Sequence, residues 1–335
     1  RIANNDFMVS NQPFVYLSKT STNNFNDSNS FRYGTANAVS ETADSNVYSN
    51  NVFETLTARG LMLNGMDSNT VTGNTLRNVS MIGIHVLANG NIIRNNVFDS
   101  VAQGVYLSGV TSRDCTVDSN TFLNNSSYAI TVSSASTDSI ANNRIEGAGT
   151  YGICMNSACT TTVTGNVVAN CSAYGIYMLN SYSNQVCGNR LDSNALGQIY
   201  LNGASTENNS IDSNVITNSI ASGIYVSASV RNVFRANRLV TAARSGIYVS
   251  AANDNRFEQN AVTGCQGHAV VLQGTSAADT FSKNNFANSN RGCSNTTSAG
   301  WTFDLTRNWW GTTDSAVISS AMAGSAAGYV CWQPY

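Results

Sequence analysis

Few residues of this chain have side chains suited to acid–base chemistry. The sequence holds two histidines, His85 and His268, and two lysines. Tyr106 lies 21 residues after His85. An imidazole beside a phenol could supply the base and the acid of a polysaccharide lyase. His85 and Tyr106 are therefore the catalytic candidates, provided that the spacing between them corresponds to one structural repeat.

A second group of residues has the chemistry of ligand binding. Tyr177, Tyr200, Tyr225 and Tyr248 recur at steps of 23 to 25 residues, so a repeat of that length would line them up. A strip of aromatic rings could stack on sugar rings. The alternative is a structural ladder, because Tyr suits β surfaces and packs against itself. Two further candidates lie in an arginine-rich stretch that could meet an acidic glycan, Arg235 and Arg238.

Several other chemistries lack the residues that they need. There is no C-x-x-C pair, so neither a zinc site nor any other metal or cofactor is indicated. Glycoside hydrolysis requires two carboxylates on one face, and no predicted outward column supplies them on adjacent repeats. The net charge of −2 does not suit a nucleic-acid partner. No apolar run approaches the ~18 residues of a membrane span, so we expect no membrane insertion.

The spacing of these residues belongs to a repeat that runs through most of the chain. An apolar residue lies three positions before each repeated Asn, and a Gly-apolar-x-apolar segment follows most of them by nine. These segments alternate with period two, which predicts three short strands per repeat. The motif Asn-x-apolar recurs every 22 to 25 residues, at Asn51, Asn74, Asn96, Asn120, Asn143, Asn166, Asn189, Asn214, Asn237, Asn260, Asn284 and Asn308.

Such short strands bury a face only when repeats stack on one another. We therefore predict an all-β fold, a right-handed parallel β-helix of about 12 rungs with three strands per ~23-residue rung. The predicted parts are an irregular partial rung at residues 1–28, the β-helix at 29–311 and a cap at 312–335. A short helix within residues 314–323 could cover the last rung, because an open end is a sheet edge.

The repeated Asn has a structural interpretation. Asn tolerates the left-handed αL conformation of a sharp corner and hydrogen-bonds to nearby backbone. Identical amides one rung apart can also form a ladder. A second column lies five residues earlier, at Asn46, Asn69, Asn91, Asn184, Asn209, Asn232 and Asn255. We interpret both columns as structural.

Asn-x-apolar combined with Gly-Ile-Tyr-Val, as at Gly223–Val226 and Gly246–Val249, resembles the parallel β-helix repeat family. That family includes pectate-lyase-like enzymes, alginate epimerases and the periplasmic NosD type. The resemblance covers about residues 29–311 and implies the fold. It implies no single activity, because the family spans lyases, hydrolases, epimerases and inert shafts. The Asp-Pro-His-type motif of the epimerases and the Gly-His-Gly and Arg-Ile-Lys motifs of polygalacturonases are absent from this sequence.

The eight cysteines separate by their position in the repeat. Cys171 and Cys265 share one column but are four rungs apart, about 19 Å, which is too far for a disulfide bond. We expect them to be buried thiols. Cys293 and Cys331 lie in the irregular C-terminal part, and we predict a disulfide bond between them.

These observations favour a secreted or surface-exposed protein with an elongated surface that binds polysaccharide and no recognisable intact active site. The expected location is extracellular, on the cell surface or periplasmic, because Lys is scarce while Asn, Ser and Thr are abundant. The first alternative is a polysaccharide lyase, hydrolase or epimerase. The second is a structural shaft of a surface appendage or phage fibre, for which a homotrimer is one arrangement. A start at Arg1 suggests a processed product or a fragment.

Overall fold

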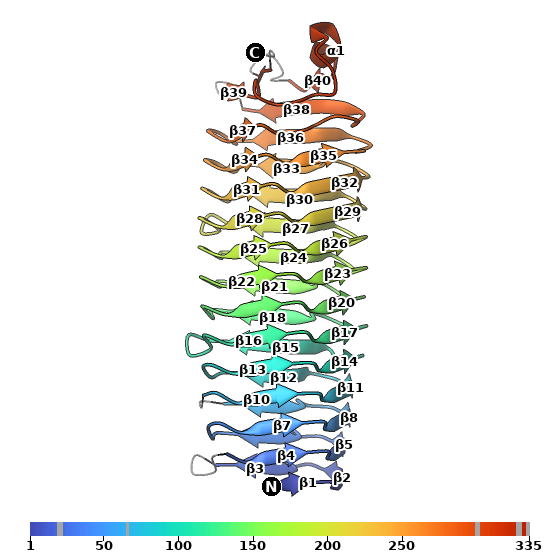
Figure 1. Cartoon of the computed structure of the whole chain (residues 1–335), viewed down its shortest axis with the longest axis vertical. Helices are drawn as coiled ribbons and strands as arrows, with labels where there is room; N and C mark the ends of the chain where they lie inside the picture. Colours follow the sequence, from blue (N-terminus) through green and yellow to red (C-terminus); the bar gives the residue numbers. More distant parts are fainter. Residues whose placement is uncertain (19–22, 65–66, 299–301, 326–329, 333–335) are drawn as a thin grey trace. The chain divides into compact units, whose positions relative to one another are not determined.

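The computed structural model describes residues 1–18, 23–64, 67–298, 302–325 and 330–332 (Figure 1). It divides into two compact units, Arg1–Cys171 and Ser172–Tyr335. In each unit the chain passes in turn through three parallel sheets, here called A, B and C. Each full rung thus contributes one strand to every sheet, as the repeat predicts.

The first unit contains seven complete rungs and two strands of an eighth. Sheet A consists of β1 (Ile2–Ala3), β4 (Phe25–Asp27), β7 (Val47–Ser49), β10 (Thr70–Thr72), β13 (Ile92–Arg94), β16 (Thr116–Asp118), β19 (Ser139–Ala141) and β22 (Thr162–Thr164). Sheet B consists of β2 (Asp6–Ser10), β5 (Ser30–Gly34), β8 (Val52–Leu56), β11 (Thr75–Val79), β14 (Val97–Asp99), β17 (Thr121–Leu123), β20 (Arg144–Glu146) and β23 (Val167–Ala169). Sheet C consists of β3 (Val15–Leu17), β6 (Val39–Glu41), β9 (Leu61–Leu63), β12 (Ile82–Val86), β15 (Gln103–Ser108), β18 (Ile130–Ser133) and β21 (Ile153–Asn156).

The second unit repeats this arrangement and ends in a less regular part. Sheet A consists of β25 (Gln185–Cys187), β28 (Ser210–Asp212), β31 (Val233–Arg235), β34 (Arg256–Glu258) and β37 (Thr280–Ser282). Sheet B consists of β26 (Arg190–Asp192), β29 (Val215–Ser219), β32 (Arg238–Ala242) and β35 (Ala261–Thr263). Sheet C consists of β24 (Tyr174–Leu179), β27 (Gly197–Asn202), β30 (Ser222–Ser227), β33 (Ile247–Ser250), β36 (His268–Gly274), β38 (Arg291–Thr297) and β40 (Met322–Ala323). A separate two-stranded sheet pairs β39 (Phe303–Asp304) with β41 (Val330–Cys331).

The predicted β-helix is confirmed, with slightly more turns than expected. Each unit contributes seven strands to its sheet C, or about 14 turns where the sequence predicted about 12. The additional turns arise at the two ends, where the sequence repeat is weak but strands such as β3 and β40 still pair in parallel. The predicted domain boundaries at residues 28 and 311 stay a prediction.

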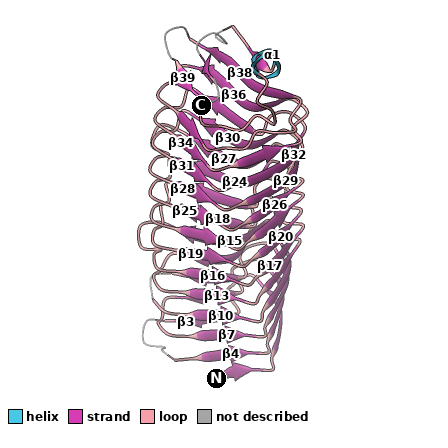
Figure 2. Cartoon of the chain, turned by 45° about the horizontal axis from the view of Figure 1, so that its top comes forward, coloured by secondary structure: helices cyan, strands magenta, loops and turns pink. Residues whose placement is uncertain are grey.

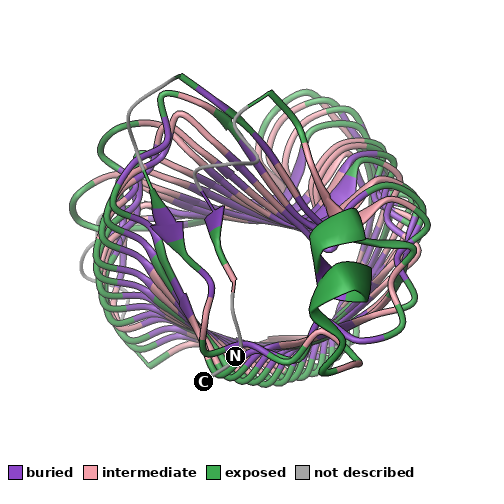
Figure 3. Cartoon of the chain, turned by 90° about the horizontal axis from the view of Figure 1, so that it is seen from above, coloured by how far each residue is buried: buried purple, intermediate pink, exposed green. Residues whose placement is uncertain are grey.

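The C-terminal part contains α1 (Ser315–Ser320), the one helix among the described residues (Figure 2). Asp314 caps it, because its carboxylate accepts a hydrogen bond from the backbone N–H of Ala316 at 2.9 Å. Only Ile318 of this helix is buried. Most of the helix is exposed, as Figure 3 shows. The helix expected within residues 314–323 is thus present, but it is shorter than that interval.

The predicted Cys293–Cys331 disulfide bond is wrong, since both thiols are free. Cys293 is buried in β38 of sheet C, where it lies opposite Met322. Cys331 is exposed in β41, which pairs with β39 in the separate sheet. The chain places the two residues in different sheets, which their irregular sequence surroundings did not reveal. Cys171 and Cys265 are buried thiols, as expected.

The core consists of the inward residues of the short strands. Val117, Phe122, Ile140 and Ile145 are at most 1% exposed, and Val163 and Val168 are fully buried, as predicted. Like residues stack from rung to rung. The rings of Phe98 and Phe122 lie 4.6 Å apart at an angle of 7°.

The Gly repeated at or near the start of many sheet C strands is required by close packing. A Cβ atom on Gly104 would lie 2.5 Å from the carbonyl oxygen of Ala129 and 2.6 Å from the ring of Phe122. The large ring in sheet B therefore uses space that the missing side chain leaves at the next corner. A Gly in one rung thus accommodates a Phe in the next rung, as Gly104 does for Phe122 and Gly83 for Phe98.

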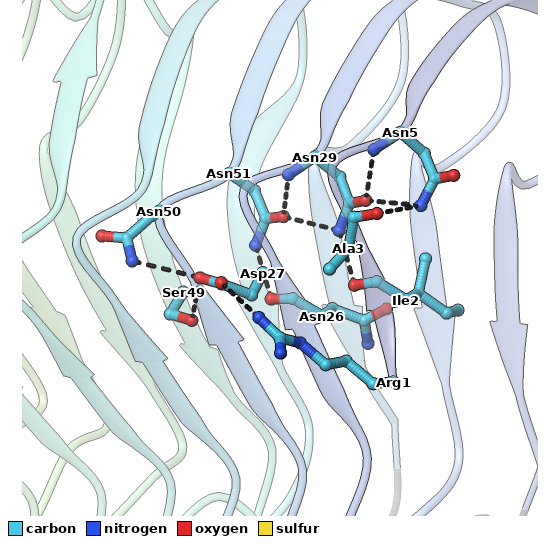
Figure 4. Close-up of polar contacts among 10 residues, drawn as sticks. All are labelled: Arg1, Ile2, Ala3, Asn5, Asn26, Asp27, Asn29, Ser49, Asn50 and Asn51. Carbon is cyan, nitrogen blue, oxygen red and sulfur yellow. Dashed lines mark hydrogen bonds and ion pairs between the residues drawn. The ribbon is translucent and has the colours of Figure 1, made fainter.

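The main Asn column forms a continuous amide ladder within each unit. In the first unit the oxygen of Asn51 accepts two hydrogen bonds from Asn29, from its backbone N–H at 2.9 Å and from its side-chain amide at 3.1 Å (Figure 4). Asn120 and Asn143 are joined in the same way at 3.0 Å, which confirms that they occupy neighbouring rungs. The Asn amide also bonds to backbone carbonyls, as Asn143 does to Val117 at 2.9 Å.

The expectation that the ladder Asn itself adopts the αL conformation was wrong. The αL residue of the corner is the one before the ladder Asn, for example Asn50 with φ of 54° and Ser119 with φ of 54°. The ladder residue itself follows the turn and directs its amide into the corner. The αL position accepts many residue types, whereas the ladder position needs both a donor and an acceptor.

The second column has exceptions that place carboxyl groups in the interior. Asp279 in the second unit accepts hydrogen bonds from the backbone and the side-chain amide of Asn255, at 2.8 and 2.9 Å. Burial raises the pKa of Asp279 to about 7. In the first unit Asp138 accepts the backbone N–H of Cys115 at 2.9 Å, and burial raises its pKa to about 7 as well.

Phe122→Ala should lower the free energy of unfolding by about 3–5 kcal/mol, because it deletes a fully buried ring and its stacking contact with Phe98. Urea unfolding followed by circular dichroism measures this. The exposed neighbour Asn124 provides the control, as Asn124→Ser should change the unfolding midpoint little. A cost below about 1 kcal/mol for Phe122→Ala would contradict this account of the core.

Asp279→Asn should stabilise the protein at pH 8, by an amount on the order of 1–3 kcal/mol. The folded-state pKa of Asp279 is raised to about 7 from an ordinary value of 3.8, so the folded protein binds this proton more tightly than the unfolded chain. Stability therefore falls as the pH rises from about 4 through 7. The amide has no such dependence, and unfolding midpoints at pH 5 and pH 8 should differ less in the variant. The exposed neighbour Asp254→Asn is the control, and equal pH dependence in Asp279→Asn and the parent would refute the assignment.

Candidate functional site

Four tyrosines form a column on the outer face of sheet C in the second unit, here called the tyrosine column. Tyr177, Tyr200, Tyr225 and Tyr248 occupy equivalent positions on β24, β27, β30 and β33. The residues on either side of each Tyr point inward, as Ile224 and Val226 do around Tyr225, and both are fully buried. Strand alternation therefore places the four phenol rings outside.

The rings do not form the flat strip that the sequence suggested. Tyr200 and Tyr225 stack on each other, with centroids 4.4 Å apart and an angle of 5°. Tyr248 is turned by 88° against Tyr225 at 4.9 Å. Tyr200 and Tyr225 thus each cover one face of the other ring. The ring of Tyr248 is nearly perpendicular to that of Tyr225.

The hydroxyl groups of the column are held by polar neighbours. The amide of Asn202 donates a hydrogen bond to the Tyr177 hydroxyl at 3.1 Å. The hydroxyl of Tyr248 donates to Gln273. Burial raises the pKa of Tyr200 and of Tyr248, so both hydroxyls stay protonated at neutral pH. Tyr200 and Tyr248 thus present neutral phenols that can take part in hydrogen bonds.

A cavity of about 450 Å³ lies beside the tyrosine column. Its walls include Tyr225 and Tyr248 from the column and Arg244 from the corner that precedes β33. Arg244 belongs to the arginine-rich stretch of the sequence, whereas the other corner residues fall between the repeated motifs and were not predicted. The available signal was a large apolar residue in two successive corners, Leu196 and Ile220.

The structure does not bring Arg235 and Arg238 to this surface. Arg235 lies on β31 in sheet A, where it donates to the carboxylate of Asp212 at 2.6 and 3.1 Å. Arg238 begins β32 in sheet B. The two arginines therefore occupy other sheets than the tyrosine column, and Arg235 already has an acidic partner.

His85 and Tyr106 are neighbours in the first unit. They lie opposite each other on β12 and β15, and their rings stack at 4.9 Å with an angle of 6°. Nε2 of His85 is 3.3 Å from the hydroxyl of Ser108. The histidine is only 7% exposed. Burial of the imidazole, and to a smaller extent the positive charge of Arg59, lower the pKa of His85 to about 4.

This environment limits the chemistry available to His85. The imidazole is neutral at neutral pH and, at a pKa of about 4, a weak base. One ring face packs against Tyr106, and little of the side chain reaches solvent. The pair is thus brought together as predicted, in a form closer to a packed aromatic pair than to an open acid–base site.

Comparison with known protein families identifies the family of this chain. A family model described as "Periplasmic copper-binding protein (NosD)" matches residues 1–109 and 87–209. A second, described as "Right handed beta helix region", matches residues 151–308. The chain belongs to the right-handed β-helix repeat family. No match was found among curated protein sequences.

Solved structures similar to this β-helix protein share its fold at low sequence identity. The A-module of a mannuronan C-5 epimerase, AlgE4 from Azotobacter vinelandii, is 12% identical with a TM-score of 0.58, covering 88% of this chain and 89% of that one. A PL6 alginate lyase in complex with a trisaccharide is 11% identical with a TM-score of 0.57, covering 85% and 80%. PfbA, a surface adhesin of Streptococcus pneumoniae, is 13% identical with a TM-score of 0.53, covering 86% and 85%.

The residues that the structure describes do not fit the copper site that one family description implies. Copper sites combine converging imidazole, thiolate and thioether groups. Nδ1 of His85 is buried without a hydrogen-bond partner, and Met62 lies opposite His85 on β9. Within the described ranges, no group of three or more His, Cys, Asp or Glu side chains is placed to share a metal ion.

In the part of the chain that the structure describes, no helix is long and apolar enough to cross a bilayer.

The pKa of His85 can be measured directly by NMR titration of its imidazole signals. We expect a midpoint near 4, against an ordinary value of 6.5. The unfolded chain then binds a proton that the folded protein does not, so the contribution of His85 to stability is complete above pH 6.5 and is lost as the pH falls toward 4. The variant His268→Gln identifies the signals, since only His85 then remains. A midpoint above 6 would show that His85 is more open to solvent than the structure has it.

Proposed function

We propose that this protein binds polysaccharide in the periplasm or outside the cell, and that its binding surface is the outer face of sheet C in the second unit. The observation that carries the proposal is the tyrosine column with the cavity at its side. Phenol rings combine apolar area with a hydrogen-bonding hydroxyl, which suits the mixed C–H and O–H surface of a sugar. The strand spacing of about 4.8 Å lets one chain contact several rings.

The comparisons support this proposal at the level of substrate class. Two of the similar structures are named for action on mannuronan or alginate, and a third is named an adhesin of a bacterial surface. The periplasmic description of the NosD family model supports the proposed location. Sequence identities of 11 to 13% transfer no individual residue, so the binding residues are argued from this structure alone.

A polysaccharide lyase, hydrolase or epimerase is the second candidate function. The observation in its favour is the direct contact between His85 and Tyr106 on the outer side of sheet C in the first unit. A lyase would produce unsaturated uronates, which absorb ultraviolet light. Incubation with polyuronates tests this, and His85→Gln together with Tyr106→Phe should abolish any absorbance increase if the pair is catalytic. Activity that survives both changes would remove the pair from consideration.

Replacing Tyr200 and Tyr225 with Ala should abolish retention on the polysaccharide that the parent binds. The parent is expected to bind in the micromolar to millimolar range, about −4 to −8 kcal/mol, because the contacts are shallow. The fold should persist, since neither ring is in the core and the stacked pair contributes only about 0.5–1.5 kcal/mol. Affinity electrophoresis against acidic and neutral polysaccharides measures retention, and circular dichroism checks the fold.

Tyr128 and Tyr151 provide the matched control, as another neighbouring pair whose rings are 5.5 Å apart. They lie in the first unit, outside the proposed surface, so their double Ala variant should be retained like the parent. If Tyr200→Ala with Tyr225→Ala binds as well as the parent, the column is only a structural ladder. If that variant instead loses an oligomeric state in light scattering, the column is a subunit interface and the structural-shaft alternative is favoured.

A further inference from the structure

The cavity beside the tyrosine column has two kinds of wall. Leu196 and Ile220, from the corners before β27 and β30, are 52% and 56% exposed and form an apolar side. Tyr225 and Tyr248 form an aromatic side. The cavity of about 450 Å³ falls in the range of ~300–1,000 Å³ that small ligands occupy. Large apolar side chains held open to solvent beside aromatic rings indicate a surface that a ligand covers.

The charge on the lining residues of this cavity is positive. Arg244 is the charged residue among those that line it, and no Asp or Glu contributes to its walls. Other arginines of the second unit are paired with acids, as Arg231 is with Glu207 and Arg235 with Asp212. Arg244 is exposed and makes no ion pair among the described residues of the chain.

The backbone fixes the position from which Arg244 reaches the cavity. Its N–H donates to the carbonyl of Ala221 at 3.2 Å, and its carbonyl accepts from the N–H of Gly267 at 2.8 Å. The corner is thus bonded on both sides within the second unit. Ser222 and Ser245 also line the cavity and add polar residues to its wall.

We infer that this cavity is a subsite for one acidic sugar unit, whose carboxylate or sulfate group binds the guanidinium of Arg244. The planar guanidinium matches the geometry of both anions. The C–H face of the sugar ring packs on Tyr248, which is turned out of the Tyr200–Tyr225 stack, and Leu196 and Ile220 contact the opposite edge. The inference rests on the proposed polysaccharide binding and makes it specific, because it predicts selection for acidic over neutral chains.

The test compares one oligosaccharide with and without its charge. A tetrasaccharide of uronic acids, its carboxyl-reduced counterpart and a sulfated tetrasaccharide are titrated into the full chain by calorimetry. We expect the uronate or the sulfate to bind about tenfold more tightly than the reduced form, the gain typical of one charge-assisted hydrogen-bonded pair. Raising the salt from 0.05 to 1 M should remove most of this difference.

Arg244→Gln should remove the preference, so that charged and reduced tetrasaccharides bind alike, while Arg238→Gln should keep it. Arg238 is an exposed arginine on β32 in sheet B, so the control makes the same change in net charge away from the cavity. The relative affinities of the uronate and the sulfated sugar identify which anion the cavity accommodates. Circular dichroism verifies that both variants are folded.

Different results would contradict the acidic subsite and the proposed polysaccharide binding. Binding of all three tetrasaccharides with equal affinity, unchanged in Arg244→Gln but lost when Tyr200 and Tyr225 are replaced, would overturn the acidic subsite and keep the polysaccharide surface. Loss of the preference in Arg238→Gln as well would show a general charge effect and would also overturn the subsite. Absence of binding to every tetrasaccharide and polysaccharide tried would overturn the proposed function itself.

Discussion

The register between successive rungs is the constraint on which the rest of this structure depends. Each ladder Asn accepts two hydrogen bonds from the equivalent Asn of the rung before, as Asn51 does from Asn29. The same amide bonds to backbone carbonyls that a tight corner leaves unpaired. Because an unpaired polar group in the interior costs about 1–3 kcal/mol, a shift in register would be costly at every corner.

Fixed register turns sequence periodicity into surface columns. Residues one repeat apart lie about 4.8 Å from each other whatever their chemistry, so the fold places like side chains in contact. Inside, this produces stacked rings such as Phe234 and Phe257, 4.6 Å apart. Outside, it produces the tyrosine column and the His85–Tyr106 pair. The same geometry therefore stabilises the interior and creates the outer columns for which we propose ligand binding.

The corners accept more residue types than the strands do. The corner between sheets A and B needs one residue with positive φ and one ladder residue, as Asn50 and Asn51 show. The corner between sheets B and C contains no residue of the main Asn column and is therefore more open to variation. Leu196, Ile220 and Arg244 occupy such positions in the second unit. Specific recognition can change there without disturbing the core, which is why the proposed subsite combines residues of the repeat with residues outside it.

The sequence alone determined the repeat, the three strands per rung, the buried column around Phe122 and the alignment of Tyr177 with Tyr248, because local alternation and a constant period decide these. Only the tertiary structure decided how far the rings turn within the column, which face carries Arg235, and that Cys293 and Cys331 lie in different sheets. Side-chain torsions and the irregular ends depend on neighbours from other rungs rather than on period. The cavity at Arg244 likewise exists only because separate corners converge on one side of sheet C.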